Sequence, residues 1–61
     1  MNFYQKLSQP AVRAEMAEEW GLAASQWQKL LTLPAAYPWR MWIRGRISYC
    51  RERASAPFRR H

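Results

Sequence analysis

The sequence predicts an all-α fold, a small domain of three to four helices. The chain has 61 residues, which allows one domain with one core. Apolar residues recur at spacings of three and four along most of the chain, as on the buried face of a helix. Glycine and proline stand where these stretches end. We therefore expect a single helical domain over residues 1–54, followed by a basic flexible tail over residues 55–61.

The N-terminal third is predicted to contain two helices. The first is short and covers Asn2–Leu7. Ser8 can cap the next helix, and Pro10 suits its first turn, where a missing N–H has no cost. This second helix is expected to run to about Trp20. Its expected buried residues are Val12, Met16 and Trp20, with Ala17 beside them. Its acidic residues, expected to form a solvated face, are Glu15, Glu18 and Glu19.

A glycine and two prolines define the next boundaries. Gly21 is expected to end the second helix, because glycine adopts the left-handed conformation without a Cβ penalty. The third helix is predicted from about Ala24 to Leu31 or Thr32 and must end before Pro34. Its expected buried residues are Trp27, Leu30 and Leu31. Residues 33–38, with the sequence LPAAYP, are predicted to be an irregular connector.

Residues 39–54 fit two different structures. As a helix, the segment has one apolar face and one basic face, with prolines at both ends. The apolar face would hold Trp39, Trp42, Ile43, Ile47 and Cys50, and the basic face Arg40, Arg44 and Arg51. As a hairpin, the segment would turn at Arg44–Arg46 and form the basic wing of a winged helix. We favour the helix, because one glycine inside a helix costs only about 1 kcal/mol.

The charge of the chain lies in its second half. The formal net charge is +6, and the charges of residues 1–31 sum to zero. The remaining positive charges are all arginines, and Glu52 is the one acid among them. A guanidinium forks onto the oxygens of phosphate or carboxylate. An arginine-only basic half therefore favours a partner rich in phosphate or carboxylate, whereas the simpler interpretation is a solvated basic face.

Residues 13–32 carry the pattern of a helix-turn-helix. Ala17 is the small residue where two helices would cross, and Gly21 is the residue at the turn. The apolar frame around them consists of Met16, Trp20, Leu22, Trp27 and Leu30. This segment resembles the helix-turn-helix family of DNA-binding domains, as found in phage and plasmid repressors and in small excisionases.

The resemblance implies a DNA-binding function. It makes residues 24–31 the recognition helix, whose exposed side chains would read the major groove: Ser25, Gln26, Gln28 and Lys29. The arginines of the second half would hold phosphates, and these are Arg40, Arg44, Arg46 and Arg51. The expected protein is a small regulator or architectural factor of a phage or other mobile element, in the cytoplasm. It would bind DNA as a homodimer or as cooperative copies, because one small module buries little surface.

Two other functions remain open. The chain could be an adaptor or inhibitor that binds an acidic host protein, with Trp and Arg as the energetically dominant residues. It could also be a peripheral membrane or RNA-associated peptide that uses residues 39–53. Membrane association is less expected, because it leaves the first half without a role. All four tryptophans, including Trp39 at the predicted start of a helix, fall on predicted core faces, so burial is favoured over stacking on bases.

The composition argues against catalysis and against cofactors. The chain has no aspartate, and its one histidine is His61 at the end of the sequence, so a Ser-His-Asp arrangement is impossible. A single cysteine, Cys50, excludes a disulfide framework and indicates a reducing compartment. No glycine-rich loop or zinc-finger spacing is present. We expect no enzyme activity, no metal site, no cofactor and no small-molecule substrate. No apolar run approaches the about 18 residues of a membrane span.

Overall fold

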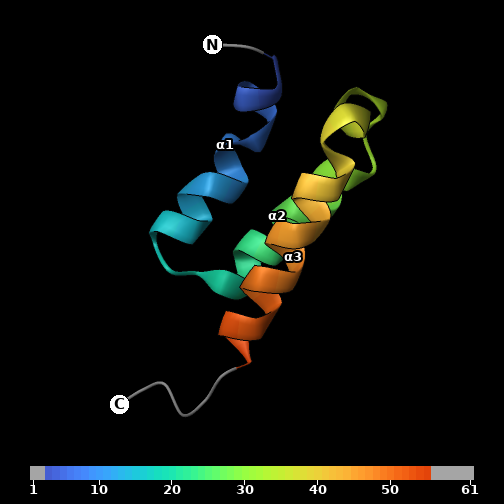
Figure 1. Ribbon diagram of the computed structural model, residues 1–61. Coiled ribbons are helices and arrows are strands. Elements are labelled where there is room, and N and C mark those ends of the chain that lie inside the picture. Colours follow the sequence, from blue (N-terminus) through green and yellow to red (C-terminus); the bar gives the residue numbers. More distant parts are fainter. Residues whose placement is uncertain (1–2, 56–61) are drawn as a thin grey trace.

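The computed structural model describes residues 3–55. They form three α-helices and one 3₁₀ helix: α1 (Phe3–Met16), α2 (Trp20–Leu31), η1 (Pro34–Trp39) and α3 (Arg40–Ala54). The α-helices run alternately down, up and down (Figure 1). No strand occurs in the described residues. The prediction of a small all-α fold is confirmed.

The first helix is continuous, so the predicted interruption at Ser8 is wrong. Ser8 is buried, and its hydroxyl donates to the backbone carbonyl of Gln5 at 3.2 Å instead of capping a new helix. The helix continues through Pro10. One face of the whole helix carries the residues that pack inward, which are Tyr4, Leu7, Ser8, Ala11 and Ala14. This continuous face outweighs the local signals for a break.

The chain reverses at residues 17–19, before Gly21. Glu18 has a φ of 59°, the left-handed conformation. The N–H of Glu19 bonds to the carbonyl of Ala14, and the N–H of Glu18 to the carbonyl of Glu15, both at 2.9 Å. This pair of bonds is the Schellman motif, with glutamate where glycine is usual. The prediction that Gly21 forms the corner is therefore wrong. Gly21 lies in the first turn of α2 and has no positive φ.

The second helix ends as predicted and is followed by ordered structure. Thr32 closes α2, and its hydroxyl donates to the carbonyl of Lys29 at 2.7 Å. Residues 33–38 were predicted to be an irregular connector, but all of them except Leu33 lie in the 3₁₀ helix η1, which ends at Trp39. Ala36 within η1 is fully buried. The connection between α2 and α3 is therefore part of the packed domain.

The third helix settles the choice between helix and hairpin. Residues 40–54 are one α-helix, so the alternative of a basic wing is wrong. Gly45 lies within it, with open space around the position of a Cβ. Ser55 closes the helix, and its hydroxyl donates to the carbonyl of Arg51 at 3.0 Å. Residues 56–61 of the predicted tail lie outside the described residues.

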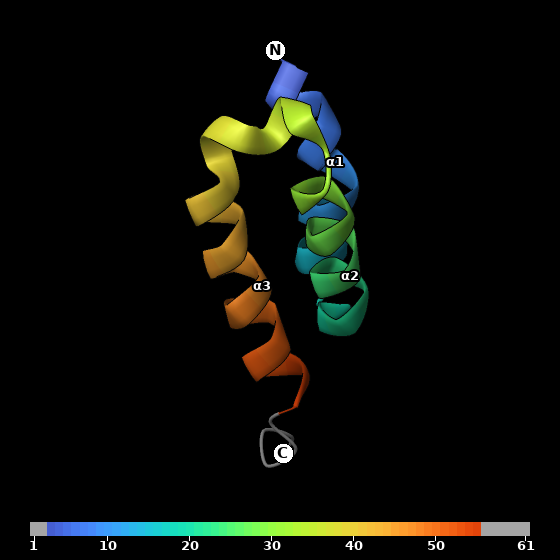
Figure 2. The same ribbon diagram turned by 90° about the vertical axis from the view of Figure 1, so that its right-hand side faces the viewer.

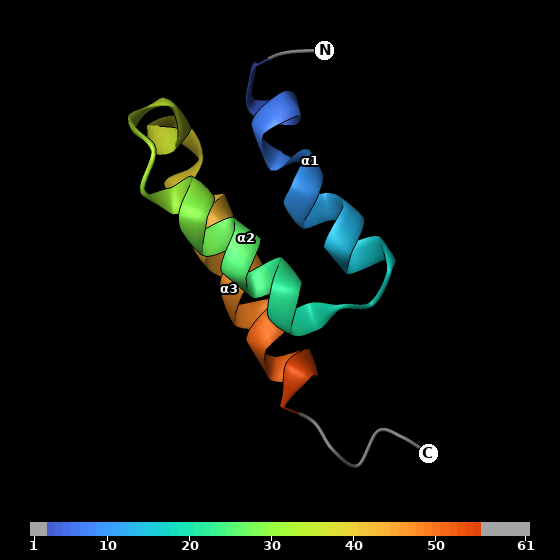
Figure 3. The same ribbon diagram turned by 180° about the vertical axis from the view of Figure 1, so that it is seen from behind.

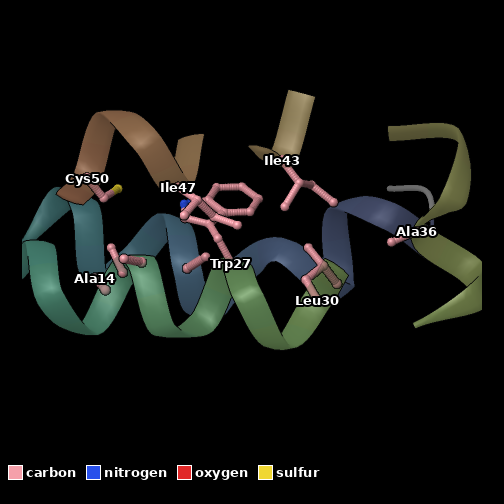
Figure 4. Packing of buried hydrophobic residues seen from close by; sticks show 10 residues of the cluster. Ala14, Trp27, Leu30, Ala36, Ile43, Ile47 and Cys50 are labelled. Atoms are coloured by element: carbon pink, nitrogen blue, oxygen red, sulfur yellow. The ribbon is translucent and has the colours of Figure 1, made fainter. Parts of the chain in front are cut away.

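The core forms around one tryptophan. Trp27 is 2% exposed and points from α2 towards Ile47 of α3 (Figure 4). Around it lie the other buried apolar residues: Ala11, Ala14, Ala23, Ala24, Leu30, Ala36, Ile43, Ile47 and Cys50. Five of these are alanines, which let the helices approach closely. The predicted core positions Trp27, Leu30, Ile43, Ile47 and Cys50 are confirmed.

Several large apolar residues predicted to be buried are exposed. Among these are Val12, Met16 and Leu22, and the small Ala17 is also exposed. The small Ala11 and Ala14 face the core in place of Val12 and Met16. The inward face of α1 is therefore rotated by about one residue from the predicted one, or about 100°.

The three helices form a flat, elongated molecule. Its principal extents are 39, 19 and 13 Å. The view turned by 90° shows α2 and α3 antiparallel and side by side (Figure 2). Views from opposite sides show α1 next to the pair of α2 and α3 (Figures 1 and 3). One side of α3 therefore faces the other helices, and the remainder is uncovered.

Candidate nucleic-acid interface

The third helix carries arginine on two flanks. Ile43, Ile47 and Cys50 are its buried residues and define the side that faces the core. A residue one position before a buried one lies about 100° to one side, and a residue one position after it lies about 100° to the other side. Arg46 lies on the first flank, and Arg44 and Arg51 on the second. The two flanks have different surroundings.

On the inner flank, Arg46 is held by Glu15 of α1. The two side chains form an ion pair, and Arg46 Nε also donates to Glu15 Oε2 at 3.1 Å. Trp27 Nε1 donates to the same oxygen at 2.7 Å, and the Cys50 thiol donates to it at 3.3 Å. The Glu15 side chain is 15% exposed. The prediction that Glu15 faces water is wrong, because this carboxylate joins all three α-helices.

These contacts shift the pKa values of Glu15 and Cys50. Partial burial by itself would raise the pKa of Glu15, but hydrogen bonds from Arg46, Trp27 and Cys50 and the charge of Arg46 together lower it. Burial, followed by the hydrogen bond to Glu15 and its negative charge, raises the pKa of the Cys50 thiol to about 11. Glu15 is therefore held as a carboxylate and Cys50 as a thiol at neutral pH.

The inner flank continues as alternating rings and guanidinium groups. The guanidinium of Arg46 lies 4.5 Å from the ring centroid of Tyr49 and 5.7 Å from that of Trp42. The guanidinium of Arg53 lies 5.2 Å from the Tyr49 ring and 4.7 Å from the Trp20 ring. We call these five residues the aromatic–arginine ladder. Such cation–π contacts stabilise by about 0.5–1 kcal/mol each at exposed sites.

One end of the ladder differs from the prediction. Trp42 was expected in the core and is 57% exposed. Trp27 is buried, whereas Trp20 and Trp39 are half-buried. Trp39 stacks on Tyr4 with ring centroids 4.3 Å apart. The exposed tryptophan is thus Trp42.

On the outer flank, three arginines lie in water. Arg40, Arg44 and Arg51 are exposed, and we call them the outer arginine flank. Within residues 3–55, the ion pair of Arg46 with Glu15 is the only one, so no carboxylate neutralises these three. Arg40 lies over the ring of Tyr37, with 5.8 Å to the centroid. The outer arginine flank is therefore a strip of unneutralised positive charge along α3.

The predicted recognition residues of α2 fall into two groups. Ser25, Gln28 and Lys29 are exposed, and with Leu31 and Thr32 they line an open hollow of about 430 Å³. Gln26 is half-buried and lies about 200° around the helix from Gln28. The structure thus brings three of the four residues onto one surface and separates Gln26 from it.

Two features of the site were missed in sequence. The first is the role of Glu15, which no local pattern announces, because Arg46 is 31 positions away. The second is the aromatic–arginine ladder, for which a signal exists. Its α3 members Trp42, Arg46, Tyr49 and Arg53 follow one another at spacings of three and four. If residues 39–54 are taken as a helix, this spacing places Arg46 on the flank of the aromatic residues. It therefore distinguishes Arg46 from the predicted phosphate contacts Arg40, Arg44 and Arg51.

The comparisons with known proteins give no relative. No protein-family model, no curated protein and no solved structure matches this chain. Within residues 3–55, no helix is long and apolar enough to cross a membrane. The same residues contain no group of three or more His, Cys, Asp or Glu side chains placed to hold a metal ion.

Proposed function

We propose that this protein is a small DNA-binding factor that holds phosphates with its outer arginine flank. The observation that carries the proposal is the uncovered, unneutralised charge of Arg40, Arg44 and Arg51. Guanidinium groups of this kind supply the sequence-independent part of DNA affinity. At the helical rise, the three arginines span about 16 Å, the axial length of about five base pairs.

The turn between α1 and α2 supports the helix-turn-helix part of the proposal by its length, although the two helices run antiparallel (Figure 1). The two helices are joined by a turn of three residues, 17–19, which is a typical length for this motif. The recognition helix would then be the whole of α2. Ser25, Gln28 and Lys29 would face the major groove, and Gln26 would not. The proposal includes an origin of the protein in a phage or other mobile element.

Fewer arginines are available for phosphate contacts than the sequence suggested. Arg46 gives its hydrogen bonds to Glu15, so its charge is already neutralised within the domain. Arg40, Arg44 and Arg51 remain as phosphate contacts. Because the whole domain is small, a dimer or cooperative copies would be needed for high affinity.

The test is a titration against random duplex DNA at two salt concentrations. A phosphate-binding protein loses affinity steeply as salt rises, because binding releases counterions. Loss of binding between about 50 and 200 mM salt supports the proposal. Absence of binding at both concentrations rejects it. A selected target sequence then allows the base-reading part to be tested with Gln28→Ala, and Gln26→Ala is the matched control on the other side of α2.

A second candidate function has its own supporting observation. Tyr37, Met41 and Trp42 are all more than half exposed, which is unusual for large apolar side chains. With the arginines beside them, they would suit an adaptor that binds an acidic protein. Such an adaptor would show only weak, non-saturating attraction to DNA in the same titration.

A further inference from the structure

The junction of η1 and α3 carries an open hollow with a chemistry of its own. Tyr37, Pro38, Arg40, Met41 and Arg44 line this hollow, which has a volume of about 350 Å³. It lies at the end of the molecule where the chain turns from η1 into α3 (Figure 1). Tyr37 is 69% exposed and Met41 is 82% exposed. A flat ring and a polarisable thioether are therefore open to a ligand.

Two guanidinium groups stand beside these apolar side chains. Arg40 lies over the Tyr37 ring, and Arg44 follows one helical turn later on the same flank. Both belong to the outer arginine flank, which has no carboxylate partner within residues 3–55. The hollow thus combines an aromatic surface of the size of one ring with two free positive charges about 6 Å apart along the helix.

We propose that this junction hollow binds one unpaired nucleobase of a single-stranded nucleic acid. The Tyr37 ring stacks on the base, and Met41 and Pro38 close the apolar part of the hollow. Arg40 and Arg44 bind the phosphates on either side of that base. Stacking on aromatic side chains beside a basic strip is the way proteins hold single strands. The inference rests on the proposed nucleic-acid binding and adds a preference for unpaired bases.

The surroundings of the hollow favour a base over an amphipathic helix or a membrane. Beyond Met41, the side of α3 that carries the hollow continues with polar and small residues, which are Arg44, Gly45, Ser48, Arg51 and Glu52. The exposed rings of Trp42 and Tyr49 lie on the inner flank, against Arg46. A partner helix or a lipid surface needs an apolar stripe along the whole helix. On the side of the hollow, the apolar contact area ends within one helical turn, which matches a single ring.

The experiment compares three ligands at equal length and ionic strength. They are a thymine single strand, the same strand with abasic sites in place of its central bases, and a random duplex. Each is titrated against the wild-type protein, Tyr37→Ala, Tyr37→Phe and the control Met16→Ala, which removes an exposed apolar side chain outside the hollow. Circular dichroism verifies that each variant keeps its helices.

We expect the wild-type protein to bind the intact strand about tenfold more tightly than the abasic strand, as one stacked base contributes. Tyr37→Ala loses this difference, whereas Tyr37→Phe and Met16→Ala keep it. Duplex affinity changes little in all three variants. If intact and abasic strands bind equally while the duplex still binds, the base-binding hollow is wrong and the proposed function stands. If no nucleic acid binds, both fail.

A vesicle arm separates the lipid alternative. Vesicles containing phosphatidylserine carry the same kind of negative charge without bases. If Tyr37→Ala weakens vesicle binding as much as single-strand binding, the hollow is a general anionic contact, and the assignment to a nucleobase is overturned. If only single-strand binding falls, the assignment is supported.

Discussion

The two flanks of α3 carry the same residue type in opposite roles. Arg46, on the inner flank, pairs with Glu15 and lies against two rings. Arg44 and Arg51, on the outer flank, are exposed and have no carboxylate partner in the described residues. Side-chain chemistry does not separate these arginines. What separates them is α1, which places one carboxylate against the inner flank and leaves the outer flank free for a ligand.

The largest effect is expected from removing that carboxylate. Glu15→Ala leaves the Trp27 indole and the Arg46 guanidinium without their acceptor, and hydrogen bonds to charged groups contribute about 1.5–3 kcal/mol each. We expect the free energy of unfolding in urea to fall by about 3 kcal/mol. Glu52→Ala, on an exposed acid, is the control and should change it by less than about 0.5 kcal/mol. If both variants lower the free energy of unfolding equally, Glu15 does not hold the inner flank in the way described.

The next effect is a loss of stability in acid. The pKa of Glu15 is lower in the folded chain than its ordinary value of 4.5, so folding favours the carboxylate. The stabilisation is complete above pH 4.5 and is lost as the pH falls through the lower folded pKa. Urea unfolding from pH 6 to pH 3 should show this decline. In Glu15→Gln the decline should be smaller, and an unchanged decline would show that other groups cause it.

Two substitutions near the turn between α1 and α2 should raise the stability, by less than Glu15→Ala lowers it. Gly21 lies within the first turn of α2 with open space around its missing Cβ, so Gly21→Ala should raise the stability by about 0.5–1 kcal/mol. Glu18→Gly should also be stabilising, because Glu18 holds a positive φ. Thermal unfolding measures both. If Gly21→Ala is destabilising, the chain reverses at Gly21 and not at residues 17–19. The end of α1 that carries Glu15 would then differ from the one described.

The smallest effect compares two neighbouring arginines on opposite flanks. Arg53 lies over the rings of Trp20 and Tyr49, whereas Arg51 has no such contact. Arg53→Gln should lower the free energy of unfolding by about 0.5–1 kcal/mol, as for exposed cation–π contacts. Arg51→Gln should leave it unchanged within error. Chemical unfolding of the two variants, which have the same net charge, decides between a stabilising ladder and incidental contacts.

The sequence predicts the elements that local signals define. Trp27, Leu30, Ile43, Ile47 and Cys50 are buried as expected, because their spacing matches a helix and few other apolar residues compete on those faces. The end of α2 before Pro34 and the helical form of residues 40–54 are also confirmed. These features depend on periodicity and on proline, both of which act within a few residues.

The sequence fails where tertiary packing chooses between two similar faces. In α1, the set with Val12 and Met16 and the set with Ala11 and Ala14 have comparable spacing. The alanines are buried because they let neighbouring helices approach closely, which no single segment reveals. The site divides in the same way. Periodicity finds Arg40, Arg44 and Arg51 on one flank, but the loss of Arg46 to a partner 31 positions away is a property of the fold.

The most direct test of the central claim compares equal changes of charge on different helices. The double variant Arg44→Gln/Arg51→Gln removes two charges from the outer flank, and Lys6→Gln/Arg13→Gln removes two exposed charges from α1. The salt dependence of binding to random duplex DNA is measured for both and for the wild-type protein. The outer-flank variant should reduce the slope of log affinity against log salt by about 1.8, or 0.9 for each lost phosphate contact, and the α1 variant by much less. Equal reductions by the two variants would mean that net charge alone attracts DNA and would contradict a phosphate-binding flank on α3.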